Sequence, residues 1–358
     1  MAQSSVTIFG IIDAGVARTS ATGAGHSTGL ANGGNSSPRL GFRGTEDLGG
    51  GLAASFWLEG QLSNDVGNGS TQTTGLDFQR RSTVSLSGNF GELRLGRDFT
   101  ATYLNYNQFD TWGQRGLGQV ETTGPTRAGV ASYIRVSNSV GYFLPATLGG
   151  FYGSAQYAFA EQQSNKAVVL NAAGIATSAA NATTDKTNAY YGARIGYASG
   201  PVDVSGSYGV FQDAVRTVGT SFYAADYKIA NIGASYDFGP VKPRLLYQTE
   251  KMGGRGAIGD FRFDTLAIGA TAPIGAGLLR AQVAHYSQSG TANDFNKLSL
   301  GYVYNLSKRT VLYADVARLR NKGAGTVAVT SLSSSINAPA PVPGGSSTGY
   351  IVGVRHSF

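Results

Sequence analysis

The chain contains no cysteine, and only three of its 358 residues are histidine. Without cysteine there is no disulfide framework, no thiolate metal site and no cysteine nucleophile. The histidines, His26, His285 and His356, lack the spacing of metal ligands, so we expect neither a metal site nor a cofactor. We do not expect an enzyme either, because none of them lies in a motif with a nucleophile or an acidic partner.

Charge and long hydrophobic runs are also scarce. Charged residues make up 14% of the chain, well below the quarter that is usual in soluble domains. No apolar run approaches the roughly 18 residues that a membrane-spanning helix needs, and helical periodicity is not evident. Glycine, in contrast, contributes 52 residues, tyrosine 19 and phenylalanine 17. This composition is unusual for a soluble protein.

Alternation of apolar and polar residues recurs from one end of the chain to the other. Phe56 and Leu58, for example, alternate with Trp57 and Glu59. A soluble β-sandwich would bury the apolar face of such strands. A transmembrane barrel would turn that face to lipid and the polar face to the lumen. The alternation alone does not distinguish these two folds.

The connections between the strands favour the barrel. Short Gly/Pro turns alternate with long polar segments, as periplasmic turns alternate with external loops in bacterial barrels. Aromatic residues also gather near strand ends, as an interfacial girdle requires. The pattern predicts an all-β, antiparallel transmembrane barrel of sixteen strands, near residues 5–17, 37–46, 52–63, 77–88, 92–98, 131–144, 151–160, 188–199, 202–212, 226–238, 241–250, 263–272, 278–289, 296–306, 310–320 and 348–358.

Several sequence runs, in order along the chain, resemble the general porins of Gram-negative outer membranes, in their betaproteobacterial, neisserial-like branch. The runs are SSVTIFGIIDAGV at Ser4–Val16, RLGFRGTEDLGGGLAASFWLEGQL at Arg39–Leu62, RRSTVSLSGNFGELRLGRDFT at Arg80–Thr100, LGYVYNLSKRTVLYADVA at Leu300–Ala317 and the terminal GVRHSF. The resemblance implies a single barrel domain over residues 1–358, located in the outer membrane and assembled as a homotrimer. It also implies that the third external loop, about 99–130, folds into the pore.

The two ends of the chain agree with export. The last residues form an alternating strand that ends on Phe358, which suits the final strand of an outer-membrane barrel. No signal peptide precedes the first strand. We interpret Met1, followed by Ala2 and Gln3, as a start codon placed after a removed leader.

Arginine dominates the basic residues. Of 28 basic residues 20 are arginine, and the first 135 residues contain ten arginines and no lysine. The net charge is +7. Arginine stays charged at any working pH, and pores that favour anions are lined by arginine and lysine. The composition therefore predicts a basic passage.

Strand alternation indicates which arginines face the lumen. It turns Arg39 and Arg43 inward on one strand, and it turns Arg135 inward between Ile134 and Val136, which are expected at the lipid. At the next pair the arguments differ: alternation turns Arg81 inward, whereas the family motif places Arg80 in the constriction. A β-bulge would reconcile the two, and we favour Arg80.

The resemblance thus implies a constriction with a basic row on the barrel wall, made of Arg39, Arg80 and Arg135. Glu59 and Asp110 are the carboxylates expected opposite this row. Loop 3 offers Asp110 as its only acidic residue before Glu121 and lacks the acidic stretch of the enterobacterial pattern. We therefore expect a net positive constriction that favours anions.

The function expected is passive diffusion of small hydrophilic solutes, mainly anions. The alternative is a substrate-specific channel for organic or aromatic carboxylates on the same barrel. Four aromatic residues of loop 3 bear on this choice as a stacking surface or, as we favour, as loop packing: Tyr103, Tyr106, Phe109 and Trp112. The partners expected are further copies of the chain, outer-membrane lipid and lipopolysaccharide. Nucleic acid is not expected, because the arginines alternate within strands and form no basic patch.

Overall fold

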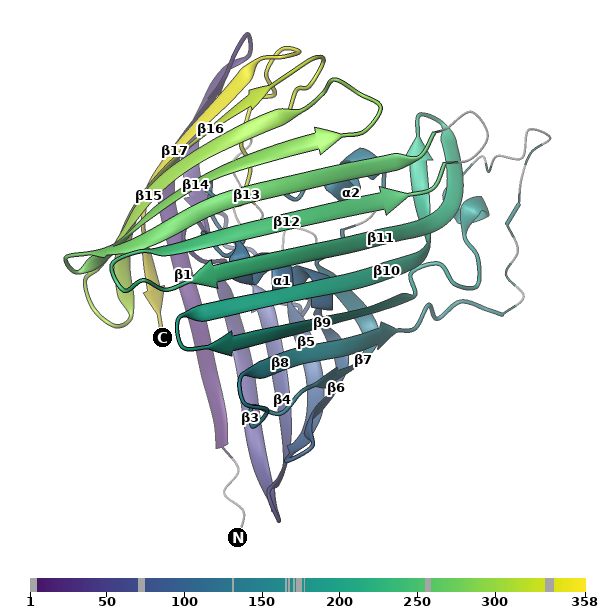
Figure 1. The fold of residues 1–358 in the computed structure, drawn as a ribbon, viewed down its shortest axis with the longest axis vertical. Helices are drawn as coiled ribbons and strands as arrows, with labels where there is room; N and C mark the ends of the chain where they lie inside the picture. Colours follow the sequence, from purple (N-terminus) through teal and green to yellow (C-terminus); the bar gives the residue numbers. More distant parts are fainter. Residues whose placement is uncertain are drawn as a thin grey trace.

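The structure is a computed structural model that describes residues 5–69, 75–130, 132–164, 166, 168–169, 171, 176, 178–254, 259–331 and 338–358. It is a β-barrel (Figure 1). The strands of the first half are β1 (Ser5–Ala21), β2 (Gly25–Asn32), β3 (Arg39–Gly49), β4 (Leu52–Gln61), β5 (Arg81–Gly88), β6 (Gly91–Phe99), β7 (Arg135–Phe143), β8 (Phe151–Ala158) and β9 (Tyr190–Ser199). Those of the second half are β10 (Val202–Val218), β11 (Ser221–Tyr236), β12 (Lys242–Met252), β13 (Phe261–Ile274), β14 (Gly277–Gln288), β15 (Phe295–Asn305), β16 (Thr310–Asn321) and β17 (Ser346–Ser357).

The sheet closes on itself. From β3 onward each strand pairs antiparallel with the next, and β17 returns to pair with β1. Residues Ser5–Ile11 of β1 pair with β3, whereas Ala14–Ala21 pair with β2. The barrel therefore has sixteen strands, β1 and β3 to β17, with β2 as an additional strand beside the outer half of β1. The expected sixteen-stranded antiparallel barrel is confirmed.

The outer surface of this barrel is apolar, as alternation predicted. Val6, Val84 and Val352 are 68%, 54% and 66% exposed, and they lie on the face that the barrel turns outward. Their neighbours along the strands, such as Ser85 and Asp13, are buried on the inner side. An apolar outside and a polar inside are the arrangement that a barrel adopts in lipid. No helix within the described residues is long and apolar enough to cross a membrane.

Two segments expected as loops form strands instead. Within 18–36, β1 continues to Ala21 and β2 follows; within 213–225, β10 and β11 extend to meet at a turn after Val218. A register shift between Phe211 and Ala214 carries the pair past Asp213, which has a φ of 45°. Beyond this point Val215, Thr217 and Phe222 have high β-propensity, which explains why the hairpin continues.

Loop 3 contains two short helices that hydrophobic periodicity did not reveal, α1 (Ala101–Phe109) and α2 (Gly124–Ala128). Thr100 caps α1, because its hydroxyl accepts a hydrogen bond from the amide of Tyr103 at 3.1 Å. Pro125 lies in the first turn of α2, and Gly129, with a φ of 70°, ends it. A third short helix, η1 (Ala180–Ala182), is a 3₁₀ turn between β8 and β9. Figure 1 shows α1 inside the barrel, behind β10 and β11.

Candidate functional site

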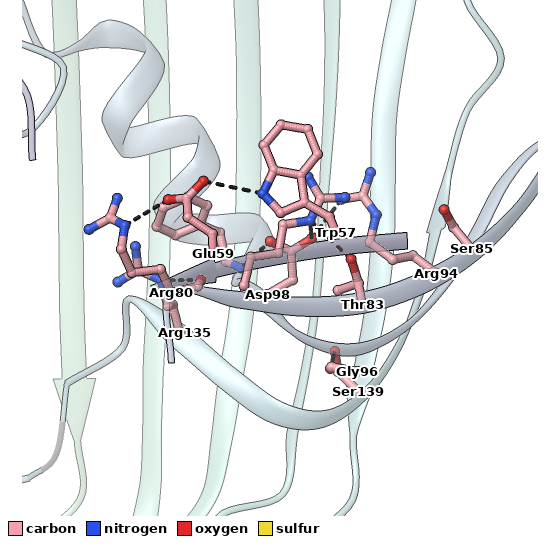
Figure 2. A network of polar contacts seen from close by, with 12 residues as sticks. Trp57, Glu59, Arg80, Thr83, Ser85, Arg94, Gly96, Asp98, Arg135 and Ser139 are labelled. Carbon is pink, nitrogen blue, oxygen red and sulfur yellow. Dashed lines mark hydrogen bonds and ion pairs between the residues drawn. The ribbon is translucent and has the colours of Figure 1, made fainter. Parts of the chain in front are cut away.

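Glu59 of β4 holds two arginines on the inner wall of the barrel. Its Oε1 accepts a hydrogen bond from Arg80 Nε at 2.7 Å and lies 3.3 Å from Arg39 Nη1. Its Oε2 accepts a hydrogen bond from the indole of Trp57 at 3.2 Å. Figure 2 shows the carboxylate between the Arg80 side chain and the Trp57 ring. One carboxylate therefore fixes two cations, so this group keeps a net positive charge.

The pair Arg80 and Arg81 does not divide into one inward and one outward residue. Glu59 pairs with Arg81, the first residue of β5. The backbone carbonyl of Glu59 also accepts a hydrogen bond from the amide of Arg80 at 3.1 Å. Two residues thus lie opposite one, as in a bulge. Arg81 bonds to Thr83, which faces the lumen, and Arg80 bonds to Glu59. Both side chains therefore bond to residues of the inner wall.

Arg135 joins the same group from β7. Its Nε donates to the carbonyl of Arg80 at 2.8 Å, and its guanidinium lies 4.2 Å from the centre of the Phe99 ring. Val136, expected at the lipid, is instead buried against Ala158 and Tyr190. The alternation is interrupted here by a register shift on β6 between Gly96 and Asp98 and by a φ of 56° at Asn138. The structure thus brings together Arg39, Arg80, Arg135 and Glu59, which we call the wall cluster.

The end of the first external loop also folds into the barrel, which the sequence analysis did not anticipate. The amides of Asn35 and Ser36 donate to Asp13 Oδ2 at 2.9 and 2.5 Å, and the Tyr313 hydroxyl donates to Asp13 Oδ1 at 2.7 Å. The Ser36 hydroxyl in turn accepts a hydrogen bond from Arg39 Nη2 at 3.1 Å. A buried carboxylate on β1 therefore anchors the loop segment that supports one arginine of the wall cluster.

Loop 3 docks against the opposite wall, through the helix α1. Asn105 donates to Asn231 of β11 at 2.8 Å, and Gln108 donates to Asp203 of β10 at 2.8 Å. The Phe109 ring lies so close to Gly233 of β11 that a Cβ at that position would overlap it. Polar pairs and one glycine thus fix the near end of the loop.

A second set of contacts fixes the far end of loop 3. Glu121 accepts a hydrogen bond from Lys297 of β15 at 2.6 Å, and both side chains are about 1% exposed. The amide of Glu121 donates to the Tyr286 hydroxyl of β14 at 2.8 Å. Loop 3 is therefore held at both ends, and Lys297 neutralises the carboxylate of Glu121.

The four aromatic residues of loop 3 serve packing. Tyr103, Tyr106, Phe109 and Trp112 are at most 6% exposed. Tyr103, Tyr106 and Phe109 belong to one buried cluster with Tyr227 of β11, and the Arg280 guanidinium lies 4.9 Å from the centre of the Trp112 ring. These rings therefore present little free surface on which a solute could stack.

Asp110, expected opposite the wall arginines, lies on loop 3, and its carboxylate is engaged within that loop. It is 3% exposed and ends α1. Its two carboxylate oxygens accept hydrogen bonds from the amides of Trp112, Gln114 and Val120 at 3.3, 2.6 and 3.3 Å. Burial raises the pKa of the Asp110 carboxyl above its ordinary value of 3.8, and these amides oppose the rise. Its geometry suits a residue that holds the turn of loop 3 together.

Arg115 is a residue that the sequence analysis missed. It lies on loop 3, and its Nη1 donates to the carbonyl of Gly113 at 2.9 Å. Burial lowers the pKa of the Arg115 guanidinium; nearby Arg80 lowers it further, whereas Asp110 and Glu59 raise it. Arg39 also lies within the field of Arg115. Loop 3 therefore brings a fourth arginine towards the wall cluster. The sequence analysis missed Arg115 because it considered only the acidic residues of this loop.

Further arginines line the same wall towards the short turns. Arg81 and Arg43 lie 4.6 and 5.2 Å from the centre of the Trp57 ring. Arg94 lies 4.0 Å from the Phe143 ring and bonds to Glu92 and Asp98. Stacking on aromatic rings holds these guanidinium groups in place, and the carboxylates of Glu92 and Asp98 neutralise Arg94. Arg43 thus extends the basic surface beyond the wall cluster, whereas Arg81 shares the Asp98 carboxylate with Arg94.

The histidines lie elsewhere. His285 and His356 are on the outer face and bond to Asn296 and Thr310 at 2.8 and 2.9 Å, and His26 is exposed on β2. Within the part of the chain that the structure describes, no three histidine or acidic side chains are grouped as metal ligands would be.

Comparison with known proteins agrees with this architecture. Residues 1–324 match the family model described as Gram-negative porin. The chain is 40% identical over 363 residues to the outer membrane porin protein 32 of Delftia acidovorans, covering all of this chain and 95% of that one. It is 31% identical to an outer membrane porin protein of Bordetella pertussis, over 87% of this chain and 88% of that one.

A solved structure is similar over the whole length. The anion-selective porin from Comamonas acidovorans is 38% identical, with a TM-score of 0.86, and the match covers 99% of this chain and all of that one. Together with the closed sixteen-stranded barrel and its apolar outer surface, these matches show that the chain belongs to the family of Gram-negative outer-membrane porins.

Proposed function

We propose that this porin is a water-filled diffusion channel that passes small hydrophilic solutes and favours anions over cations. The observation that carries the proposal is the charge of the wall cluster. Arg39, Arg80 and Arg135 gather around Glu59, and Arg115 approaches from loop 3. Glu59 pairs with only two of these four guanidinium groups, so an anion lowers their mutual repulsion and a cation raises it.

The narrow part of the passage lies between the wall cluster and loop 3. The loop is fixed to β10, β11, β14 and β15, while the cluster lies on β3 to β7. Solutes therefore pass between a basic wall and a loop whose acidic residues, Asp110 and Glu121, are engaged with backbone amides and a lysine. The similar porin from Comamonas acidovorans is anion-selective, which agrees with this charge balance.

The channel works without a covalent step, and each solute moves down its own gradient. A general pore fits better than a channel specific for aromatic carboxylates, because the loop 3 rings are buried. We also propose that the chain acts as a homotrimer, in contact with outer-membrane lipid through the apolar outer face. Small anions are the expected permeants.

The first test is the reversal potential of the protein in a planar bilayer across a KCl gradient. Three-step insertions with a chloride-favouring potential are expected. Arg39→Gln, Arg80→Gln and Arg135→Gln should each lower the chloride preference, with Arg309→Gln, in a short turn outside the passage, as the control. A cation-favouring potential, or unchanged permeability ratios in all three variants, would refute the role given to the wall cluster.

A further inference from the structure

The outer face of the barrel carries a groove that the channel does not use. It has a volume of about 680 Å³ and crosses β13 to β16 near their long-loop ends. We call it the β13–β16 groove. Two rows of cross-strand partners line it, and each ends in an arginine: an apolar row of Ile268, Val283 and Leu298 ends at Arg318, and a mixed row of Leu266, His285 and Asn296 ends at Arg320.

The apolar row forms the floor. Ile268 pairs with Val283, and Val283 pairs with Leu298; the three are 53%, 51% and 58% exposed. The mixed row contributes Leu266 to this floor, and His285 and Asn296 lie between Leu266 and Arg320. Ile268, Val283, Leu298 and Leu266 therefore give the groove an apolar floor. Such a surface suits an acyl chain rather than a polar solute.

The polar end of the groove carries two cations. Arg318 and Arg320 are both exposed on the outer face of β16. The cross-strand neighbours of Arg318 are Leu298 and Thr348, and those of Arg320 are Asn296 and Ser346. All four neighbours are uncharged, so no carboxylate stands beside either guanidinium on the adjoining strands.

An arginine on β13, at the same end of the barrel, does have a carboxylate beside it. Arg262 lies at the same end of β13 and forms an ion pair with Asp264 at 2.8 Å. Its charge is therefore balanced within the protein. Arg318 and Arg320 remain as two guanidinium groups at the border between polar and apolar surface, which is where a lipid headgroup lies.

We propose that the β13–β16 groove binds a phosphate-bearing, acylated glycolipid of the outer leaflet, with its phosphate on Arg318 and Arg320 and an acyl chain along Ile268, Val283 and Leu298. Guanidinium groups bind phosphate through paired, charge-assisted hydrogen bonds. The charge complements the phosphate, and the apolar floor complements the chain. A free anion would not use that floor. The proposal concerns the outside of the barrel and is independent of ion selection inside it.

The test compares two double variants that remove the same charge. Arg318→Gln/Arg320→Gln acts at the groove, whereas Lys308→Gln/Arg309→Gln acts in the exposed turn between β15 and β16, at the other end of the same strands. Binding of purified lipopolysaccharide to the refolded protein in detergent is measured for each. The groove variant should bind about tenfold to thirtyfold more weakly, while the turn variant should bind like the unaltered protein.

Further arms identify the bound chemistry. Lipopolysaccharide treated with phosphatase should bind the unaltered protein as weakly as intact lipopolysaccharide binds the groove variant. Leu298→Gln should weaken lipid binding while both arginines remain. If inorganic phosphate alone bound as tightly as the lipid, the groove would be a site for a free anion and the proposal would fail. Equal lipid binding by both double variants would also overturn it.

Two controls separate this proposal from the others. If the groove variant dissociated on unheated gels while the turn variant did not, the groove would be an interface between copies and not a lipid site. The permeability ratio of the groove variant should equal that of the unaltered protein. Loss of lipid binding with unchanged selectivity therefore supports the lipid site, and loss of selectivity with unchanged lipid binding concerns only the channel.

Discussion

The Oε1 atom of Glu59 lies 2.7 Å from Nε of Arg80 and 3.3 Å from Nη1 of Arg39, so a single oxygen is shared by two guanidinium groups. In this ion-paired group two cations face one carboxylate. On the same wall, Arg94 has two carboxylates, Glu92 and Asp98. The shared oxygen makes the cluster sensitive to the loss of one negative charge.

Glu59→Gln should therefore raise the preference for chloride. Removing the only carboxylate of the wall cluster adds one net positive charge beside the passage, which is worth roughly a twofold to fivefold rise in the permeability ratio through water-filled space. Reversal potentials at 0.1 M KCl measure it. Glu92→Gln removes the same charge near a short turn and should have a smaller effect; equal effects in both variants would contradict the prediction.

Arg115→Gln should lower the chloride preference by roughly twofold to threefold, as for a wall arginine, because the charge is lost from the other side of the same passage. Arg127→Gln is the matched control. Arg127 lies on the same loop but bonds to Gln288 at 2.9 Å and stacks on Phe295. If Arg115→Gln left the reversal potential unchanged, loop 3 would contribute no charge to selection.

The selectivity should weaken as salt is added. The Debye length falls from about 10 Å at 0.1 M to about 3 Å at 1 M, so the field of the arginines reaches less of the passage. Permeability ratios measured at both concentrations should move towards unity. A ratio that stayed constant would indicate direct binding sites or steric selection in place of a screened field.

Asp110→Asn should loosen loop 3. An amide nitrogen would replace one of two oxygens that accept backbone hydrogen bonds, leaving a buried donor against a donor at a cost of about 1–3 kcal/mol. Thermal unfolding and the noise of the open current measure the change. Asp237→Asn, which affects one bond to Gly239 in an exposed turn, should behave like the unaltered protein.

Gly233→Ala should displace α1 from its wall. The added Cβ would overlap the Phe109 ring, and overpacking of this kind costs about 1–3 kcal/mol. We expect a lower unfolding temperature and an altered conductance. Gly206→Ala on β10 is the control, because its Cβ would lie 3.7 Å from the nearest atom, the Asn231 carbonyl oxygen. Equal conductance and stability in the two variants would rule out this docking contact.

The strands could be predicted because each one has lipid on one face and the lumen on the other, which produces an alternating sequence. Val84 and Leu86 face outward, Thr83 and Ser85 face inward, and lipid and water impose that pattern on every spanning strand. The sequence of loop 3 has no such periodic pattern, because its residues contact several distant strands at once. The cap at Thr100 was a visible signal for α1, whereas the partners of Asp110 within its own turn were not.

Alternation and the family motif together suggested the wall arginines. At the neighbouring pair, alternation pointed to Arg81 and the family motif pointed to Arg80. Arg115 was missed because its role depends on how loop 3 folds back across the barrel. The inward segment near Ser36 was missed for a similar reason, since its anchor Asp13 lies on a strand and gives no local sign of a partner.

Each guanidinium of the wall cluster is restrained before any solute arrives: Arg39 by Ser36 and Glu59, Arg80 by Glu59, and Arg135 by a carbonyl and the Phe99 ring. Side chains that already point at the passage need not reorient when an ion enters, so the charge is preorganised. The field felt by the first anion is then the same as that felt by the next. In the proposed function, ions would therefore pass without a slow rearrangement of these side chains between one ion and the next.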